Sequence, residues 1–187
     1  MTAGANAARA ERAGYRVRPM RVEDAERIAE VHVQVWREAY RYLMPPDYLA
    51  SLDVQEFTSR WSTRLANPAS SEAKHVVGVH PDGRIVAIGS AGPSRDLPPR
   101  TGWELWAINL LAAEHGTGLA DLMMTELIGD RACSLWVLQG NERALAFYAR
   151  YGFETDGETK PHPPTGKVET RLVRDRERSP GGKETVE

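Results

Sequence analysis

Apolar residues recur at spacings of three and four in several segments of the chain, and this spacing is typical of amphipathic helices. The first such helix is predicted to begin at Val22, where acidic residues in the first turn suit the helix dipole, and Pro45-Pro46 ends whatever precedes it. Its apolar stripe consists of Ala25, Ile28, Val31, Val35 and Ala39. Further helices are predicted over residues 54–66, 116–128 and 141–150.

Runs of apolar and β-branched residues predict the strands. Residues 75–80 and 84–90 flank Pro81-Asp82-Gly83, an arrangement typical of a β-hairpin. The other predicted strands cover residues 15–18, 103–111, 132–138, 153–158 and 167–173. This order of elements predicts a single α/β domain with one mixed sheet of roughly six or seven strands, flanked by about four helices.

Both ends of the chain lack this patterning. Residues 1–14 combine small side chains with scattered charges, and residues 175–187 are charged, contain Pro and Gly, and have no apolar anchor. We therefore expect a disordered leader over 1–14 and a disordered charged tail over 175–187, because such segments cannot build a core. The folded domain is predicted to cover residues 15–174, within a chain of 187 residues.

The charge balance and the apolar runs narrow the classes of partner and compartment. Lys and Arg number 24 against 26 Asp and Glu, so there is no reason to expect a nucleic acid or an anionic membrane as partner. The start of the chain has no apolar core of the length that a signal peptide needs. The apolar run over residues 105–113 is broken by Asn109 and is too short to span a bilayer. We expect a cytoplasmic protein.

Cysteine and histidine give little sign of redox or metal chemistry. Cys133 is the single cysteine, and its apolar neighbourhood predicts a buried strand and an inert thiol. The histidines do not have the spacing of metal ligands, so no metal is predicted. They are His32, His75, His80, His115 and His162.

The segment with the clearest chemical meaning is an apolar strand, a short turn and two glycines that open a helix. Gly116 and Gly118 lie where unpaired backbone N–H groups and the helix dipole together bind phosphate, and a glycine has no Cβ to keep the phosphate away. A dinucleotide fingerprint would need glycine where Asp121 stands, and the Gly-Lys-Ser/Thr of a Walker loop is absent. A glycine turn that merely starts a helix remains an equal alternative.

Residues 115–120 resemble motif A of the GNAT acetyltransferases, whose signature is Gln/Arg-x-x-Gly-x-Gly/Ala. Gly118 and Ala120 match the signature. His115 replaces Gln or Arg, and Ala112 replaces the proline that commonly follows the strand. The resemblance implies coenzyme binding by Leu110, Leu111, His115, Gly116, Thr117, Gly118, Leu119, Ala120 and Asn141.

Residues 135–153 resemble motif B of the same superfamily, in which a strand, an Asn, a helix with Phe-Tyr and a Gly-Phe follow one another. Asn141 is a good helix N-cap, and Phe147 is expected in the core. For Tyr148, the resemblance implies that the phenol lies near the coenzyme sulfur. Both motifs occur in the expected order, and the order of elements extends the resemblance over residues 15–174.

The resemblance implies direct transfer of an acetyl group from acetyl-CoA to a primary amine of a small molecule. Tyr148 is the predicted acid for the departing thiolate, and Glu104, at the start of the apolar strand, is the candidate base acting through water. A solvated strand-end carboxylate is the alternative for Glu104. Cys133 and Ser134 lack a paired histidine, which favours direct attack over a covalent enzyme intermediate.

Other functions stay open at this stage. The same fold can serve a non-catalytic acyl-CoA-binding module, or an enzyme that acetylates a protein N-terminus or lysine. The donor could also be a longer acyl-CoA. The sequence does not determine the oligomeric state, and a homodimer is one option.

Overall fold

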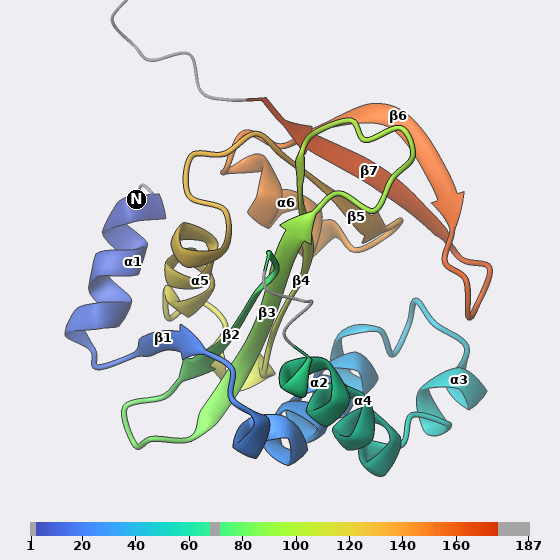
Figure 1. The fold of residues 1–187 in the computed structure, drawn as a ribbon. Helices are drawn as coiled ribbons and strands as arrows, with labels where there is room; N and C mark the ends of the chain where they lie inside the picture. Colours follow the sequence, from blue (N-terminus) through green and yellow to red (C-terminus); the bar gives the residue numbers. More distant parts are fainter. Residues whose placement is uncertain (1–2, 68–71, 176–187) are drawn as a thin grey trace, which may run out of the picture.

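The strands form one mixed sheet, seen near edge-on in Figure 1 of the computed structural model, which describes residues 3–67 and 72–175. The seven strands follow the order β1-β2-β3-β4-β5-β7-β6. All neighbours are antiparallel except β4 and β5, which are parallel. The strands are β1 (Arg16–Pro19), β2 (Lys74–Val79), β3 (Ile85–Pro93), β4 (Trp103–Leu110), β5 (Cys133–Leu138), β6 (Glu154–Pro161) and β7 (Val168–Arg174).

Helices lie on both faces of this sheet. α2 and α4 pack on one face, α5 packs on the other, and α1 lies against α5 (Figure 1). The helices are α1 (Ala3–Arg12), α2 (Ala25–Ala39), α3 (Pro46–Ala50), α4 (Val54–Ala66), α5 (Leu119–Leu127) and α6 (Glu142–Ala149), with 3-10 turns at Val22–Asp24 and Ala112–Glu114. Within the described residues, no helix combines the length and apolar character needed to cross a bilayer.

Successive residues of the central strands serve the two sides of the sheet. Val76 belongs to the apolar cluster that contains Leu119 and Met123 of α5, whereas Val77 joins the cluster that contains Ile28 of α2. This follows from the alternation of side chains along a strand. Two apolar clusters on opposite faces therefore hold the sheet between its helices.

The predicted α/β fold is confirmed, and the predicted strands and longer helices agree with the structure within a few residues. The helix expected from Gly116 begins at Leu119, because Gly118 at its N-cap has a left-handed φ of 95° and lies outside the helix. The short helix α3 was not predicted. Pro45-Pro46 does end the preceding segment, but Pro46 also starts α3, where a missing N–H costs no helical hydrogen bond.

The prediction of a disordered leader over residues 1–14 is wrong, because α1 occupies Ala3–Arg12. Ala7 and Ala10 are buried, and Ala10 has 0 % exposure. Small side chains carry little hydrophobic signal in the sequence, yet they let a helix approach its neighbour closely. Of the predicted tail over residues 175–187, residues 176–187 lie outside the described part of the chain.

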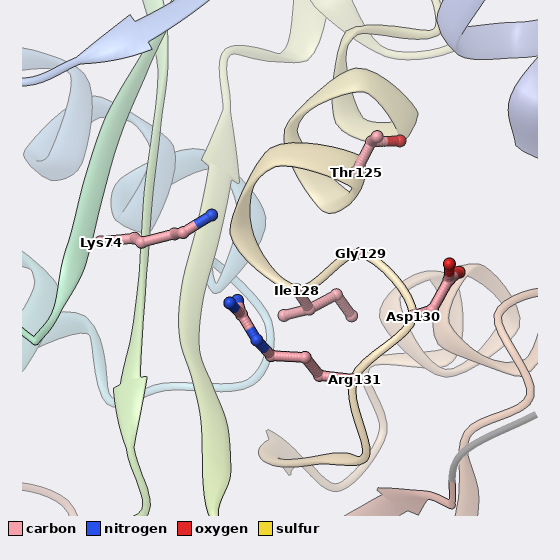
Figure 2. Close-up of a pocket in the computed structure, with 6 residues that line it drawn as sticks. All are labelled: Lys74, Thr125, Ile128, Gly129, Asp130 and Arg131. Atoms are coloured by element: carbon pink, nitrogen blue, oxygen red, sulfur yellow. The ribbon is translucent and has the colours of Figure 1, made fainter.

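Basic side chains close the C-terminal end of α5. Lys74 Nζ donates to Glu126 O at 2.6 Å, and Arg174 Nη2 donates to Gly129 O at 2.7 Å. A hollow of about 350 Å³ lies beside this end, and Figure 2 shows Lys74 and Arg131 extending into the same gap. Cations are favourable at a helix C-terminus, so we interpret this hollow as part of the helix cap.

Candidate active site

β4 and β5 run in parallel, but the pairing between them is short. It joins Glu104 to Ser134 and Leu105 to Leu135, although both strands continue for several residues. A cavity of about 1080 Å³ is lined by the continuing parts of both strands. Along it, β4 presents backbone N–H and C=O groups that can pair with an extended ligand, as in the addition of a strand to a sheet.

The N-terminus of α5 forms one end of this cavity. Gly116 and Gly118 line it with φ values of 79° and 95°, a left-handed conformation that favours glycine. Gly118 immediately precedes the first turn of α5, whose N–H groups have no partner within the helix. Such a helix start attracts phosphate groups. We call this region, residues 115–120, the phosphate loop.

His115 does not bring a fixed positive charge to the phosphate loop. Its Nε2 lies 3.3 Å from Leu110 O, so the ring is tied to the end of β4. Burial lowers the pKa of His115 below its ordinary value, and the nearby Arg143 lowers it further. The imidazole is therefore neutral at neutral pH, and the loop relies on its backbone N–H groups.

The helix α6 brings a tyrosine to the wall of the cavity. Asn141 Oδ1 accepts a hydrogen bond from Ala144 N at 3.1 Å, which confirms the predicted N-cap. Tyr148 lies in the same helix and lines the cavity. Burial raises the pKa of Tyr148, and the neighbouring Tyr40 phenol adds to this effect. The Tyr148 phenol therefore stays protonated and can donate a hydrogen bond.

The opposite end of the cavity is walled by aromatic side chains. The ring centroids of Trp36 in α2 and of Tyr40, just after α2, are 5.0 Å apart, and that of His162 in the β6–β7 turn lies 5.8 Å from that of Trp36. The indole N–H groups of Trp36 and Trp106 are buried and have no hydrogen-bond partner among the described residues. We call this end the aromatic chamber, lined by Trp36, Tyr40, Trp106, Trp136 and His162.

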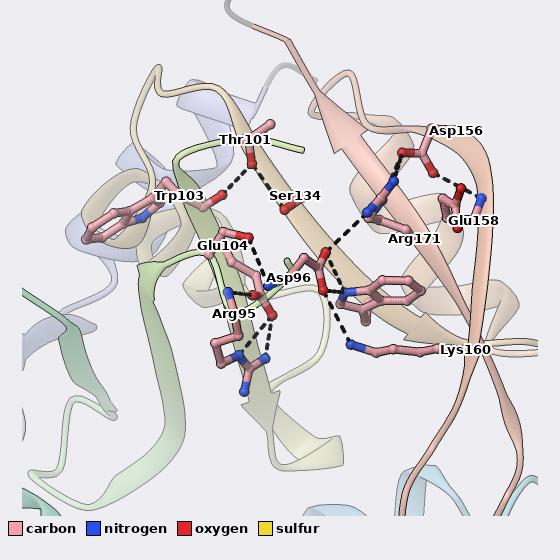
Figure 3. Close-up of polar contacts among 12 residues, drawn as sticks. Arg95, Asp96, Thr101, Trp103, Glu104, Ser134, Asp156, Glu158, Lys160 and Arg171 are labelled. Atoms are coloured by element: carbon pink, nitrogen blue, oxygen red, sulfur yellow. Dashed lines mark hydrogen bonds and ion pairs between the residues drawn. The ribbon is translucent and has the colours of Figure 1, made fainter. Parts of the chain in front are cut away.

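Basic side chains beside the aromatic chamber are matched by a carboxylate. Asp96 accepts a hydrogen bond from Trp136 Nε1 at 3.0 Å and lies 3.3 Å from Arg171 and 3.8 Å from Lys160. The Lys160 ammonium also lies 3.9 Å from the centroid of the Trp136 ring. Figure 3 shows Asp96 at the centre of these contacts, so these cations are not free to bind a further anion.

Glu169 lines the same end of the cavity and differs from these paired groups. It makes no ion pair with any residue in the described part of the chain, and its cross-strand neighbour Lys160 turns to Asp96 instead. Burial raises the pKa of Tyr40, and the charge of Glu169 raises it further. The chamber therefore presents a carboxylate that a cationic ligand can neutralise.

A cleft between diverging parallel strands, with a phosphate loop at one end, agrees with the comparison to known families. Residues 31–153 match the Acetyltransferase (GNAT) family. This chain belongs to the GNAT family of acetyltransferases. It is therefore an acyltransferase, and β4, α5 and α6, which form most of the cavity, lie inside the matched range.

Similar proteins agree with this membership. The chain is 31 % identical over 144 residues to the uncharacterized N-acetyltransferase YuaI of Bacillus subtilis (strain 168), covering 74 % of this chain and 79 % of YuaI. The crystal structure of PaiA N-acetyltransferase from Thermoplasma acidophilum in complex with coenzyme A aligns with a TM-score of 0.65 and 15 % identity, over 86 % of this chain and 99 % of that one. Spermidine N-acetyltransferase SpeG from Vibrio cholerae aligns with a TM-score of 0.55 and 12 % identity, over 86 % and 93 %.

The predicted coenzyme-binding residues divide into two groups. Those that line the cavity of this GNAT protein are Leu110, His115, Gly116, Gly118, Ala120 and Asn141. Leu119 is instead fully buried in the core, and half-buried Leu111 packs against the apolar clusters. Thr117 supports the loop from within, because its Oγ1 donates to Glu114 O at 2.8 Å.

Glu104 does not have the surroundings expected of a base. Its side chain is 1 % exposed and does not line the cavity. Arg95 N donates to Oε2 at 2.8 Å, and the Arg95 guanidinium binds Oε1 (Figure 3). In this structure Glu104 anchors the β3–β4 loop through Arg95, and its role as the base stays a prediction. The alternative of a solvated strand-end carboxylate is wrong, because the side chain is almost fully buried.

His162 is a potential base that the sequence analysis passed over. Its Nδ1 lies 2.9 Å from Thr165 Oγ1, so an Nδ1–H donated there leaves the Nε2 lone pair free. Burial lowers the pKa of His162, with Glu169 opposing the shift, and this keeps the ring neutral at neutral pH. His162 belongs to neither motif, and only the folding of the β6–β7 hairpin brings it to α2.

Two other groups of residues contribute no visible chemistry. Cys133 has 0 % exposure, which confirms its predicted burial, and burial raises the pKa of its thiol to about 12. It therefore stays protonated and is a poor nucleophile. Over residues 3–67 and 72–175, no group of three or more His, Cys, Asp and Glu side chains could hold a metal ion.

Proposed function

We propose that this GNAT protein transfers an acetyl group from acetyl-CoA to the primary amine of a small, cationic molecule. The observation that carries the proposal is the single cavity of about 1080 Å³ that extends from the phosphate loop, past Tyr148, to the aromatic chamber. A coenzyme and an acceptor can therefore meet inside one cavity, as a direct transfer requires.

In this proposal the coenzyme diphosphate binds at the phosphate loop, at the N–H groups that begin α5, of which that of Leu119 also contacts Thr117 Oγ1 at 3.3 Å. The pantetheine amides pair with the open edge of β4 between Trp106 and Leu110. Backbone N–H groups over residues 108–110 that face the open edge then bind the thioester oxygen as it becomes an oxyanion, whereas Leu111 N already donates to Val86 O at 3.0 Å. This path leads the thioester towards Tyr148.

The reaction needs a neutral amine and a stabilised leaving group. His162 Nε2 accepts a proton from the amine nitrogen, whose lone pair forms the new C–N bond as the C–S bond breaks. The electron pair of the C–S bond stays on the sulfur. The Tyr148 phenol, kept protonated by its raised pKa, donates to that thiolate. No enzyme-bound acyl intermediate is needed.

The aromatic chamber favours a small acceptor. Its walls come from α2, β4, β5 and the β6–β7 hairpin, which enclose the space on several sides. Aromatic faces and the uncompensated carboxylate of Glu169 together suit an ammonium group. Among similar folds, SpeG is by its name a spermidine acetyltransferase, which is compatible with an acceptor of this class.

An acceptor screen tests the proposal directly. The full-length protein is incubated with acetyl-CoA and panels of diamines, polyamines, arylalkylamines, amino acids and short peptides, and free thiol release is recorded. We expect release stimulated by cationic small amines and reduced in Glu169→Gln. Binding of acetyl-CoA without stimulation by any acceptor would identify a non-catalytic module, and stimulation by peptides alone would identify a protein acetyltransferase.

A further inference from the structure

The helix α1 packs directly against the phosphate loop. Arg9 Nη2 donates a hydrogen bond to Gly116 O, and Asn6 Nδ2 donates to Asp121 Oδ1 at 3.4 Å. Both Asn6 and Arg9 line the same cavity as the loop, although about a hundred residues separate them from it in the sequence. The segment ahead of β1 is therefore part of the cavity wall.

Gly118 shows how closely this helix and the loop fit. A Cβ added at Gly118 would lie 2.2 Å from Asn6 O and 2.9 Å from Asn6 C, distances that real Cβ atoms do not tolerate. A Cβ at Gly116 would meet no atom within 4 Å. Gly118 is thus required by the backbone of α1, in addition to its left-handed φ. Gly118, the loop position that suggests phosphate binding, therefore lies against α1 on its other side.

Two buried acidic residues beside the phosphate loop would repel a bound diphosphate unless a cation lies nearby. Glu114 and Asp121 are buried beside the loop, with 7 % and 5 % exposure. Glu114 accepts from Tyr15 Oη at 2.6 Å, and Asp121 accepts from Tyr151 Oη at 2.9 Å. A diphosphate placed next to these carboxylates needs positive charge to offset the repulsion.

Three arginines line this end of the cavity: Arg9, Arg143 and Arg150. Arg150 lies 3.6 Å from Asp121, so its charge is partly used by that carboxylate. Arg9 makes no ion pair among the described residues, and its contact with Gly116 O uses one Nη2–H. A guanidinium has five N–H donors, so most of those of Arg9 remain available at the loop itself.

We propose that Arg9 of α1 binds the coenzyme diphosphate, so that the helix ahead of β1 forms one wall of the coenzyme site. The inference rests on the proposed use of acetyl-CoA. It assigns to an N-terminal helix the cationic contact that the neutral His115 does not provide.

The test compares Arg9→Ala with Arg12→Ala, an exposed arginine in the last turn of the same helix. Calorimetric titration measures the affinity for acetyl-CoA and for acetyl-3′-dephospho-CoA, and circular dichroism checks the thermal midpoint. We expect Arg9→Ala to weaken binding of both ligands by about tenfold or more, the worth of a charge-assisted hydrogen bond, and Arg12→Ala to change little. Turnover with S-acetylpantetheine, which lacks the diphosphate, should be unaffected in Arg9→Ala.

Three results would overturn the inference. Equal affinity for acetyl-CoA in Arg9→Ala and Arg12→Ala would show that Arg9 does not contact the diphosphate. A loss seen with acetyl-CoA but not with the 3′-dephospho ligand would assign Arg9 to the 3′-phosphate. An equal loss of turnover with S-acetylpantetheine, which lacks the diphosphate, would show that Arg9→Ala acts by disturbing the structure. Failure of the parent protein to bind acetyl-CoA would instead refute the proposed function. The parent and the variants therefore distinguish the two failures.

Discussion

The two ends of the cavity are built in different ways. At the phosphate loop, adjacent residues of one strand–turn–helix segment supply backbone N–H groups, and the side chain of His115 is neutral and tied to β4. In the aromatic chamber, side chains line the cavity, and they come from α2, β4, β5 and the β6–β7 hairpin. Backbone recognition is local in sequence, whereas side-chain recognition is assembled from distant segments.

This difference separates the general part of the function from the specific part. The N–H groups at a helix start bind phosphate, which every acyl-CoA carries, so the proposed donor end does not discriminate between acyl groups. The chamber combines aromatic rings with the carboxylate of Glu169, which has no ion pair in the described part of the chain, and small changes there would alter which amine binds. We therefore expect variants at the two ends to change different kinetic constants.

The largest effect is expected where the two ends meet, at Tyr148. Tyr148→Phe removes the phenol oxygen but keeps the ring that packs against Phe147 and Phe153. Turnover should fall by roughly 10²–10⁴-fold, the usual worth of one acid or base, with little change in coenzyme affinity or thermal midpoint. Steady-state kinetics and calorimetry measure both. Parent-like turnover would show that the thiolate leaves without this donor.

Within the aromatic chamber, His162→Gln should lower kcat by about 10²-fold and remove the acidic limb of the pH profile of kcat. His162 is active when neutral, and burial lowers its pKa, so activity should be lost as pH falls through a value below the ordinary 6.5. Glu104→Gln is the matched control, because it changes a buried carboxylate outside the cavity. A limb that shifts in Glu104→Gln but not in His162→Gln would restore Glu104 as the base.

At the phosphate loop, two glycines with positive φ allow a matched comparison of stability. Gly116→Ala should cost about 1–2 kcal/mol in the free energy of unfolding, because alanine disfavours the left-handed conformation. Gly118→Ala should cost about 1–3 kcal/mol more, because its Cβ must also displace α1 at Asn6 O. Urea denaturation measures both. Equal losses of stability in the two variants would mean that α1 moves away from the added Cβ at no cost in the free energy of unfolding.

The smallest effect is expected at His115. His115→Arg replaces a neutral ring with a fixed charge near the expected diphosphate, so acetyl-CoA affinity should stay the same or tighten by up to about tenfold. Acceptor KM should not change, because His115 lies at the other end of the cavity. Titration of the variant with acetyl-CoA is the measurement. A large loss of affinity would show that the coenzyme takes a path different from the one proposed.

Much of the fold was predictable because its elements carry local signals. The hairpin around Pro81-Asp82-Gly83, the strand ahead of Gly116 and the helix capped by Asn141 all lie where periodicity, turn residues and capping residues place them. α1 was missed because its contacts depend on Ala7 and Ala10, whose small side chains give no apolar periodicity. Its stability depends on α5, which is distant in sequence.

The chemistry of the candidate site was less predictable than its location. Glu104 has the residue type and position of a base, but a neighbouring loop covers it and Arg95 takes up its oxygens. His162 lies in a Pro-rich turn with no motif around it, and packing against Trp36 gives it its neutral, half-buried state. Residue type can be read from a sequence, whereas solvent access and ionic partners cannot.

The sequence by itself determined the strand–glycine–helix segment and the α6 cap, because these depend on short-range hydrogen bonds and backbone conformation. Their motifs carried the resemblance to the GNAT family, which the family match then showed. Only the tertiary structure decided that β4 and β5 separate after two residue pairs, that Glu169 makes no ion pair within residues 3–67 and 72–175, and that α1 lies on Gly118. These features arise from packing between segments far apart in the chain. Burial, charge pairing and close approach are properties of that packing, which no local pattern of residues encodes.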